Sequence, residues 1–287
     1  MLTIFQTADA FNYFDMLVCT SRTVREFCRR SGTTYECFIG VKRGYWSWQA
    51  TYNRISIFTE LYNRGWRSWV LYMDADAYVV DLDFDIWAYL ARVERFGAVL
   101  VRSGATPAFW DVNAGVLMLN LGSDTGVTIL KRWQAAFDSV PEGVLRGNQR
   151  PFTGPEDQYL LHDVLRADES LWPNIHLESP DLINSPHASF IRQILRSLCP
   201  DMISRVNVLT AAVDNVLGGP GASGIKVYET AREEILSAVY QSLLGRDADT
   251  VGLQAYGKSL ATHGIERGLR EVLISVLGSE EYRRRAK

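Results

Sequence analysis

The sequence has 287 residues, of which 47% are hydrophobic and 22% are charged, and its formal net charge is −3. This composition is that of an ordinary globular protein and disfavours disorder over most of the chain. Because nucleic-acid-binding proteins usually carry a basic excess or patch, the slightly acidic balance predicts no nucleic-acid partner.

Strands and helices are predicted to alternate from residue 2 to residue 165. In chain order the pattern predicts a strand at 2–6, a helix at 14–30, a strand at 35–41, a helix at 46–62, a strand at 68–73, a helix at 86–94 that Asp85 caps, strands at 97–101 and 115–120, and helices at 127–137 and 157–165. Such alternation is typical of an α/β fold with a mainly parallel sheet flanked by helices. Ligands of these sheets lie beyond the carboxyl ends of the strands, so we expect a site just after residues 6 and 73.

The composition changes at 217–227, a stretch rich in Gly, Pro and Ser that predicts a linker. Beyond it, 230–244, 250–262 and 265–277 have helical periodicity. Gly245, Gly264 and Gly278 follow them where C-terminal caps belong. We therefore predict a large domain at 1–216, a linker at 217–227 and a small all-helical domain at 228–287.

Asp74 and Asp76 follow directly on the apolar strand at 68–73. Two carboxylates at a strand end can hold Mn²⁺ or Mg²⁺, because these ions prefer oxygen ligands and keep positions open for phosphate oxygens. Aspartate pairs also occur at 81–85 and 247–249, but neither follows a buried strand. We interpret Asp74 and Asp76 as a metal site and the 81–85 cluster as caps of the next helix.

Four segments, taken in order, resemble motifs of the GT-A glycosyltransferases over roughly residues 1–200. They are the helix 48–55, the strand 69–77 with its D-x-D motif, the strand 113–120 with its N-x-G motif, and 154–161 with its acidic D-Q motif. The resemblance is closest to the retaining galactosyl-, mannosyl- and xylosyltransferase group and more distant to glycogenin-like enzymes. It implies a GT-A (Rossmann-like) fold and a metal-dependent hexosyl- or pentosyltransferase. Such an enzyme transfers sugar from a UDP- or GDP-sugar to a glycan, lipid or protein acceptor with retention of anomeric configuration.

The same resemblance implies the site residues. Asp157 and Gln158 would lie beside the reacting face of the sugar as catalytic residues. A glycine at 115 lets the backbone approach a ligand closely, and the Asn113 amide can bond sugar hydroxyls in both directions. The alternative is a purely structural role for both segments. Asn113–Gly115 would then be a turn into a core strand, and Asp157 would be a first-turn acid that complements the helix dipole. The donor-binding residues expected are Gln6, Thr7, Ala8, Arg54, Asp74, Ala75, Asp76, Asn113, Ala114, Gly115 and Arg192.

His187 is the best candidate for a third metal ligand beside Asp74 and Asp76. Members of the family that the sequence resembles commonly use a histidine late in the glycosyltransferase domain as a further metal ligand. Imidazole is a reasonable manganese ligand. A histidine satisfied by hydrogen bonds in a loop is the alternative. The family often has Gly or Lys shortly after this histidine to hold the diphosphate, whereas Ala188 and Ser189 follow here, and Arg192 is the nearest cation.

The segments 239–253 and 277–282 resemble a helical domain of unknown function found in bacterial surface-polysaccharide and secreted proteins, with a match over about 228–284. It implies a bacterial source and polysaccharide biosynthesis, and it could support oligomer formation. Lys258 stands where a calcium hand needs a bidentate glutamate, so we predict no calcium site.

No signal segment and no apolar run of about 20 residues is present, so we predict a cytoplasmic protein without a transmembrane segment, peripheral attachment to the inner membrane being left open. The four cysteines lack C-x-x-C spacing, which fits a reducing compartment. Two alternatives to the transferase remain. One is a non-catalytic nucleotide-sugar-binding protein on the same fold. The other is a haloacid-dehalogenase-type phosphatase, which Tyr78 disfavours because Thr or Val is usual at that position.

Overall fold

A computed structural model describes residues 1–151, 154–196, 199, 201–218, 236–237, 239–246, 248–249, 252–253, 255–256 and 270–285. The chain divides into two compact units, Met1–Leu198 and Cys199–Lys287. The predicted linker at 217–227 falls almost wholly outside the described residues. Lys258, His263, most of the predicted helix at 250–262 and the first five residues of the one at 265–277 also lie outside them. The predicted domain boundaries therefore stay predictions.

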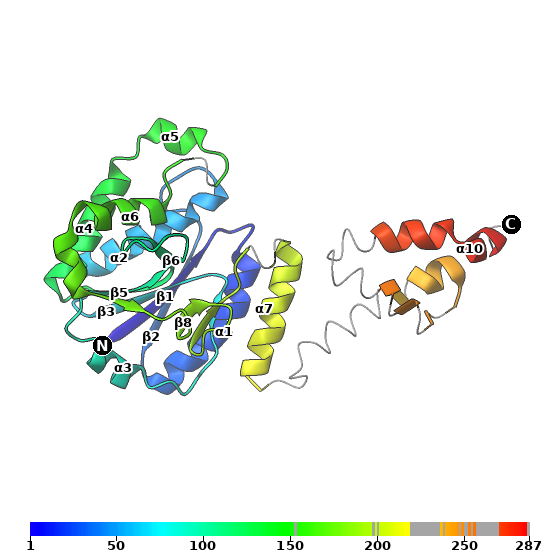
Figure 1. The fold of residues 1–287 in the computed structure, drawn as a ribbon, viewed down its shortest axis with the longest axis horizontal. Helices are drawn as coiled ribbons and strands as arrows, with labels where there is room; N and C mark the ends of the chain where they lie inside the picture. The colour runs from blue at the N-terminus through cyan, green and yellow to red at the C-terminus, as the bar shows by residue number, and fades with distance from the viewer. Residues whose placement is uncertain are drawn as a thin grey trace. The chain divides into compact units, whose positions relative to one another are not determined.

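The first unit is built on a six-stranded sheet in the order β2-β1-β3-β6-β5-β7 (Figure 1). β1 pairs parallel with β2 and β3, and β5 pairs parallel with β7, whereas β6 runs antiparallel to both β3 and β5. The predicted α/β fold with a mainly parallel sheet is confirmed. The strands are β1 (Leu2–Ala8), β2 (Thr34–Ile39), β3 (Trp69–Asp74), β5 (Ala98–Arg102), β6 (Val112–Asn120) and β7 (Ile175–Glu178).

Helices cover both faces of this sheet. On one face α2 (Asn53–Asn63), α4 (Asp124–Asp138) and α6 (Asp157–Ala167) pack in a row, while α1 (Phe14–Ser31) packs on the other against β1 and β2 (Figure 1). Because both faces are covered, every residue of β1 is buried, and so is β3 up to Asp74. A second sheet of three short strands, β4 (Ala77–Val79), β9 (Ile191–Gln193) and β8 (Ile183–Ser185), lies beside α1.

Some elements differ from those predicted. The helix expected at 46–62 is a 3₁₀ helix at Ser47–Tyr52 followed by α2, and the strand expected to reach residue 41 ends at Ile39. Gly40 stops that strand with φ +129°, a conformation that only glycine adopts readily. Asp85 accepts a hydrogen bond from the backbone N–H of Ala88 at 2.9 Å and begins α3 (Ile86–Arg92), so the capping role predicted for the 81–85 cluster is confirmed.

Among the described residues of the second unit the regular elements are helices, and they include α7 (Met202–Val216) and α10 (Glu280–Arg285). A small apolar core joins its later segments through Leu236, Tyr240, Leu244, Val272 and Val276. A helical C-terminal region is therefore confirmed. Across the described residues of both units, no helix combines the length and apolarity that crossing a bilayer requires.

Candidate functional site

The turn Asp74–Asp76 joins β3 to β4 and so stands where the two sheets meet. Gln6, fully buried in β1, supports this turn: its Nε2 donates to the backbone oxygens of Asp74 at 3.2 Å and Ala77 at 3.0 Å. The Thr20 hydroxyl donates to the Ala75 oxygen at 2.9 Å. Thr7 pairs with Asp74 across β1 and β3, which places the end of β1 beside the aspartates as expected.

One side chain holds both carboxylates. Gln193 Nε2 donates to Asp74 Oδ2 at 3.1 Å and to Asp76 Oδ1 at 2.9 Å. The pairing of β4 with β9 sets Gln193 opposite Ala77 and so delivers the amide to the turn. The side chain is 4% exposed, and its own oxygen, Oε1, is buried without a hydrogen-bond partner. The sequence carries no signal for Gln193, because a three-residue strand is too short to show periodicity.

Arg54, in the first turn of α2, connects three parts of the site. Its Nη2 donates to Asp74 Oδ1 at 2.8 Å, and its Nη1 donates to the backbone oxygen of Ala114. Its Nε donates its hydrogen to the backbone oxygen of Thr51. The same Nε lies 3.1 Å from Asp157 Oδ2, so the contact with Asp157 is an ion pair without a hydrogen bond. The guanidinium is therefore the common partner of an aspartate from β3 and an aspartate from α6.

The opposite charges in this cluster stabilise one another's ionised forms and so shift the pKa values. Burial alone would lower the pKa of Arg54, but Asp157 and Asp74 outweigh that effect and raise it, so the side chain stays protonated. Burial raises the pKa of Asp157, and the charge of Arg54 opposes the rise. The Tyr72 hydroxyl donates to Asp74 Oδ1 at 2.6 Å, and the Arg54 guanidinium lies over the Tyr72 ring at 4.4 Å.

The first turn of α6 faces this cluster. Trp133, fully buried in α4, donates from Nε1 to the backbone oxygen of Asp157 at 2.8 Å and so fixes the start of the helix. Gln158 Oε1 accepts from the backbone N–H of Ala114 at 2.9 Å. The side chain of Asp157 meets Arg54, and the N-cap residue Glu156 makes no side-chain capping bond. The contacts therefore disfavour a purely helix-capping role for Asp157.

The N-x-G segment opens β6 and reaches the same edge, because β6 runs antiparallel to β3. Asn113 Oδ1 accepts from the Gly115 N–H at 2.8 Å, and the Asn113 backbone oxygen accepts from Asn184 Nδ2 at 3.2 Å. Asn184 has a left-handed backbone, φ +68°, and its Oδ1 is buried without a partner. A Cβ at Gly115 would stand 2.5 Å from Gln193 Oε1, so the glycine makes room for the side chain that bridges the aspartates.

The contacts described above involve neither His187 nor Arg192, two of the expected site residues. His187 is exposed in the turn between β8 and β9, and within the described part of the chain no three His, Cys, Asp or Glu side chains are grouped to hold a metal. Arg192 donates from Nε to the Ala188 oxygen at 2.9 Å, and neighbouring residues of a strand point to opposite faces, so it leaves β9 on the side away from Gln193. Metal binding by His187 and donor binding by Arg192 stay predictions, as do the roles of Gln6, Thr7 and Ala8.

The residues present fit a divalent metal. Asp74 and Asp76 supply two carboxylates, and Mg²⁺ is commonly held by one or two carboxylates together with substrate phosphates. The Gln193 amide now presents its NH₂ group to both carboxylates and buries an oxygen that has no donor. A half-turn of this amide would place a third oxygen beside the two aspartates, an all-oxygen set that suits Mg²⁺ or Mn²⁺.

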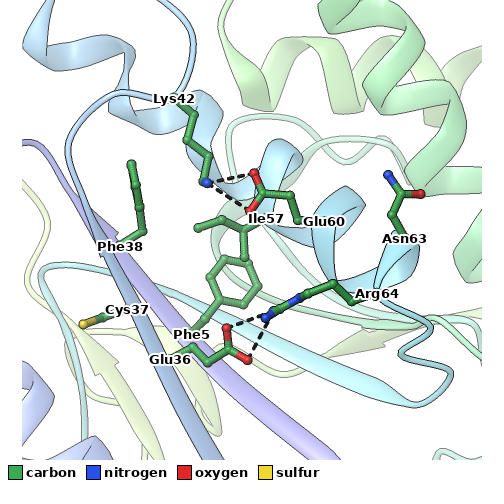
Figure 2. A pocket seen from close by; sticks show the side chains of 9 residues that line it. All are labelled: Phe5, Glu36, Cys37, Phe38, Lys42, Ile57, Glu60, Asn63 and Arg64. Atoms are coloured by element: carbon green, nitrogen blue, oxygen red, sulfur yellow. Dashed lines mark hydrogen bonds and ion pairs between the residues drawn. The ribbon is translucent and has the colours of Figure 1, made fainter.

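A separate cavity of about 420 Å³ lies between the edge strand β2 and α2 (Figure 2). Two ion pairs line it, Lys42 with Glu60 at 2.8 Å and Arg64 with Glu36 at 3.0 Å. None of the residues expected to bind the donor or the metal lines it. Its acids and bases are already paired with each other, so the cavity offers no unbalanced charge for a phosphate or a cation.

No known family profile matches the sequence, and no curated protein matches it. A glycosyltransferase involved in the glycosylation of the major capsid of PBCV-1 is similar in structure, with 14% identity over 72% of this chain and 98% of that one and a TM-score of 0.55. Drosophila β1,4-galactosyltransferase 7, solved with manganese, UDP-Gal and xylobiose, is 11% identical over 68% and 72%, with a TM-score of 0.37. The glycosyltransferase GlyE of Streptococcus pneumoniae is 13% identical over 63% of this chain and 46% of its own, with a TM-score of 0.36. The first likeness shows the fold alone and confirms the expected GT-A fold, whereas the last two TM-scores are too low to carry an argument.

Proposed function

We propose that this chain is a metal-dependent glycosyltransferase that uses a UDP- or GDP-linked hexose or pentose as donor. The observation that carries the proposal is the bridging of Asp74 and Asp76 by the Gln193 amide at a sheet edge where Arg54 and Asp157 also meet. The GT-A fold supports it, since ligands of such sheets bind at the carboxyl ends of the strands. A glycan, lipid or protein would be the acceptor, and the sugar would be transferred with retention of configuration, as the motifs imply.

In this proposal Asp74, Asp76 and the Gln193 oxygen hold the metal, with His187 as the alternative third ligand. The metal supplies Lewis-acid stabilisation of negative charge on the departing diphosphate. Tyr72 and Arg54 both bind Asp74 Oδ1, so they fix the orientation of that carboxylate before the donor arrives. Fixed groups of this kind act with little reorganisation during the reaction.

Asp157 and Gln158 are proposed to lie at the sugar end of the donor. Arg54 contacts Asp74 and Asp157 at once, so it sets the separation between the diphosphate side and the sugar side of the site. The carboxylate of Asp157 would stabilise positive charge that develops on the sugar ring. Gln158 positions the N-x-G segment by accepting from Ala114. For the helical C-terminal region we propose a role in acceptor binding or oligomer formation.

The contacts disfavour the phosphatase alternative. That chemistry needs the first aspartate as a nucleophile. Asp74 Oδ1 accepts hydrogen bonds from both Arg54 and Tyr72, and the Arg54 charge stabilises the carboxylate that would have to attack. A non-catalytic donor-binding protein would share every contact described above, so turnover of the donor separates it from the enzyme.

The test is a thermal-unfolding screen of the full chain with UDP, GDP and their sugars, with Mn²⁺ or with EDTA, followed by an assay of donor hydrolysis. At about a hundred times Kd a ligand adds about 2.7 kcal/mol to the free energy of unfolding, which raises Tm by about 5–10 °C in a protein of this size. We expect that rise with Mn²⁺ only. Asp76→Asn should abolish it, whereas Asp83→Asn, the same change at an exposed carboxylate paired with Arg30, should keep it.

Nucleotide binding that is equal in Mn²⁺ and EDTA, or that survives Asp76→Asn, would remove the metal from the proposal. Metal-dependent binding without hydrolysis or transfer of any donor would favour the non-catalytic alternative.

A further inference from the structure

Three large apolar side chains lie exposed around the start of α1. Phe11 is 86% exposed, Phe14 is 38% exposed and Val18 is 50% exposed. Phe14 and Val18 are four residues apart and share one face of the helix, and Phe11 precedes Phe14 by three residues. Single exposed apolar residues are ordinary, but a contiguous group of them marks an interaction site.

The turn that carries Phe11 is built and held in place. Asp9, only 3% exposed, accepts from the backbone N–H groups of Phe11 at 2.8 Å, Asn12 at 2.7 Å and Tyr13 at 3.2 Å. The Tyr13 hydroxyl accepts from Arg196 Nη2 at 2.8 Å. Phe11 is therefore presented to the surroundings by a hydrogen-bonded turn.

Further along α1, two arginines lie on the same face of the helix. Arg22 and Arg25 lie eight and eleven residues after Phe14, positions that fall within about 80° of it around a helix. Both are exposed, and Arg25 lies 5.7 Å from the centre of the Tyr35 ring. Asp15 stands beside this line, and Glu26 is paired with Arg29 and Arg30. We call Phe11, Phe14, Val18, Arg22 and Arg25 the α1 stripe.

We propose that the α1 stripe binds the surface of an anionic lipid bilayer. From Phe14 to Val18 the stripe rises about 6 Å along the helix axis at 1.5 Å per residue, and Phe11 lies in the turn before the helix. This rise is within the about 5–10 Å to which interfacial apolar faces enter a bilayer. Arg22 and Arg25 then stand at the level of the lipid phosphates, where basic side chains bind. The apolar part supplies insertion and the basic part supplies the preference for anionic lipid.

This binding would turn the candidate site toward the membrane. Phe11 follows Thr7 by four residues, and Thr7 is paired with Asp74, so the apolar end of the stripe belongs to the sheet edge that carries Asp74 and Asp76. Resting on the proposed function, the stripe selects lipid-linked acceptors, since these would meet the site at the bilayer surface.

The test is co-sedimentation of the full chain with vesicles, without nucleotide or metal, so that its outcome is independent of the proposed function. Vesicles of phosphatidylcholine alone are compared with vesicles that also contain phosphatidylglycerol. We expect binding chiefly to the anionic vesicles. Phe11→Ser with Phe14→Ser should lower the partition coefficient about tenfold or more, and Arg22→Gln with Arg25→Gln should lower it about thirtyfold on anionic vesicles.

The control variants make the same types of substitution at residues outside the α1 stripe. Ile39→Ser with Val144→Ser removes two other exposed apolar side chains, and Arg132→Gln with Arg166→Gln removes two arginines of α4 and α6. These variants should bind vesicles like the unchanged protein, and all variants should unfold at similar temperatures. Absence of vesicle binding, or equal binding by the stripe variants, overturns the proposal. Self-association that Phe11→Ser with Phe14→Ser abolishes, without vesicle binding, would assign the stripe to a second copy of the chain.

Discussion

The side chain of Gln193 occupies the space that a side chain at Gly115 would need. A Cβ at position 115 would meet Gln193 Oε1 at 2.5 Å and Nε2 at 2.6 Å. The same amide donates to Asp74 and Asp76, so the glycine of β6 and the carboxylates of the β3–β4 turn are linked through one side chain. The small size of residue 115 is thus a condition for the arrangement of the aspartates.

Gly115→Ala should therefore abolish metal-dependent nucleotide binding. The added methyl group displaces the amide, and overpacking of this kind costs about 1–3 kcal/mol of stability. Gly143→Ala is the matched control, because a Cβ there meets no atom within 4 Å. In Gly115→Ala with Gln193→Ala, the clash is gone, so stability should recover while binding stays impaired. Binding unchanged in Gly115→Ala, measured by calorimetry with Mn²⁺, would show that the amide is not needed.

Asp157→Asn should lower kcat about 10²–10³-fold while the donor Kd changes little, because a fixed charge beside the sugar acts mainly in the transition state. Asp163→Asn is the control on the same helix, since that carboxylate is exposed and pairs with Arg166 at 3.6 Å. Steady-state kinetics with the identified donor and acceptor measure both values. Turnover close to that of the unchanged protein would exclude Asp157 from the mechanism.

Asp111 should make stability depend on pH. Burial opposes its ionisation, but hydrogen bonds from Ser103 and Thr106 outweigh burial and hold its pKa below the usual value. The ionised form therefore stabilises the folded state above the unfolded pKa of about 3.9, and that contribution is lost as pH falls through the folded pKa. We expect Asp111→Asn to lower Tm at neutral pH and to approach the unchanged protein in acid. A difference in Tm that is constant with pH would contradict this account.

A chain that ends at Gly224 should keep metal-dependent nucleotide binding and slow donor hydrolysis. The residues of the proposed site run from Gln6 to Gln193 and all belong to Met1–Leu198. Binding is measured by the same thermal screen as for the full chain, and acceptor transfer is measured separately. Insoluble or unfolded protein on truncation would show that the two units form one core.

The strands and helices around the D-x-D motif were predictable because each shows either a helical period or an unbroken apolar run. β1, β3, α1, α4 and α6 were all expected within a few residues of their bounds. The position of Asp74 and Asp76 at a strand end was likewise readable, since an apolar run precedes them directly. The antiparallel direction of β6 could not be predicted, because an apolar strand has the same sequence pattern in either direction.

The partners of the aspartates depend on pairings between distant segments. Gln193 reaches them only because β9, three residues long, pairs with β4. Arg54 was expected in the site, yet its simultaneous contact with Asp74 and Asp157 depends on how α2 and α6 pack on the sheet. Local sequence patterns do not encode such packing, so the residue types could be anticipated and their network could not.

The distance along the chain between the aspartates and their amide has a consequence for synthesis. Gln193 follows Asp74 by 119 residues and Asp76 by 117. At about 5–20 residues per second, a ribosome delivers the carboxylates on the order of ten seconds before the amide that bridges them. Arg54 precedes both aspartates, so the growing chain already carries a cation for Asp74 while the last strand of the site is still unmade.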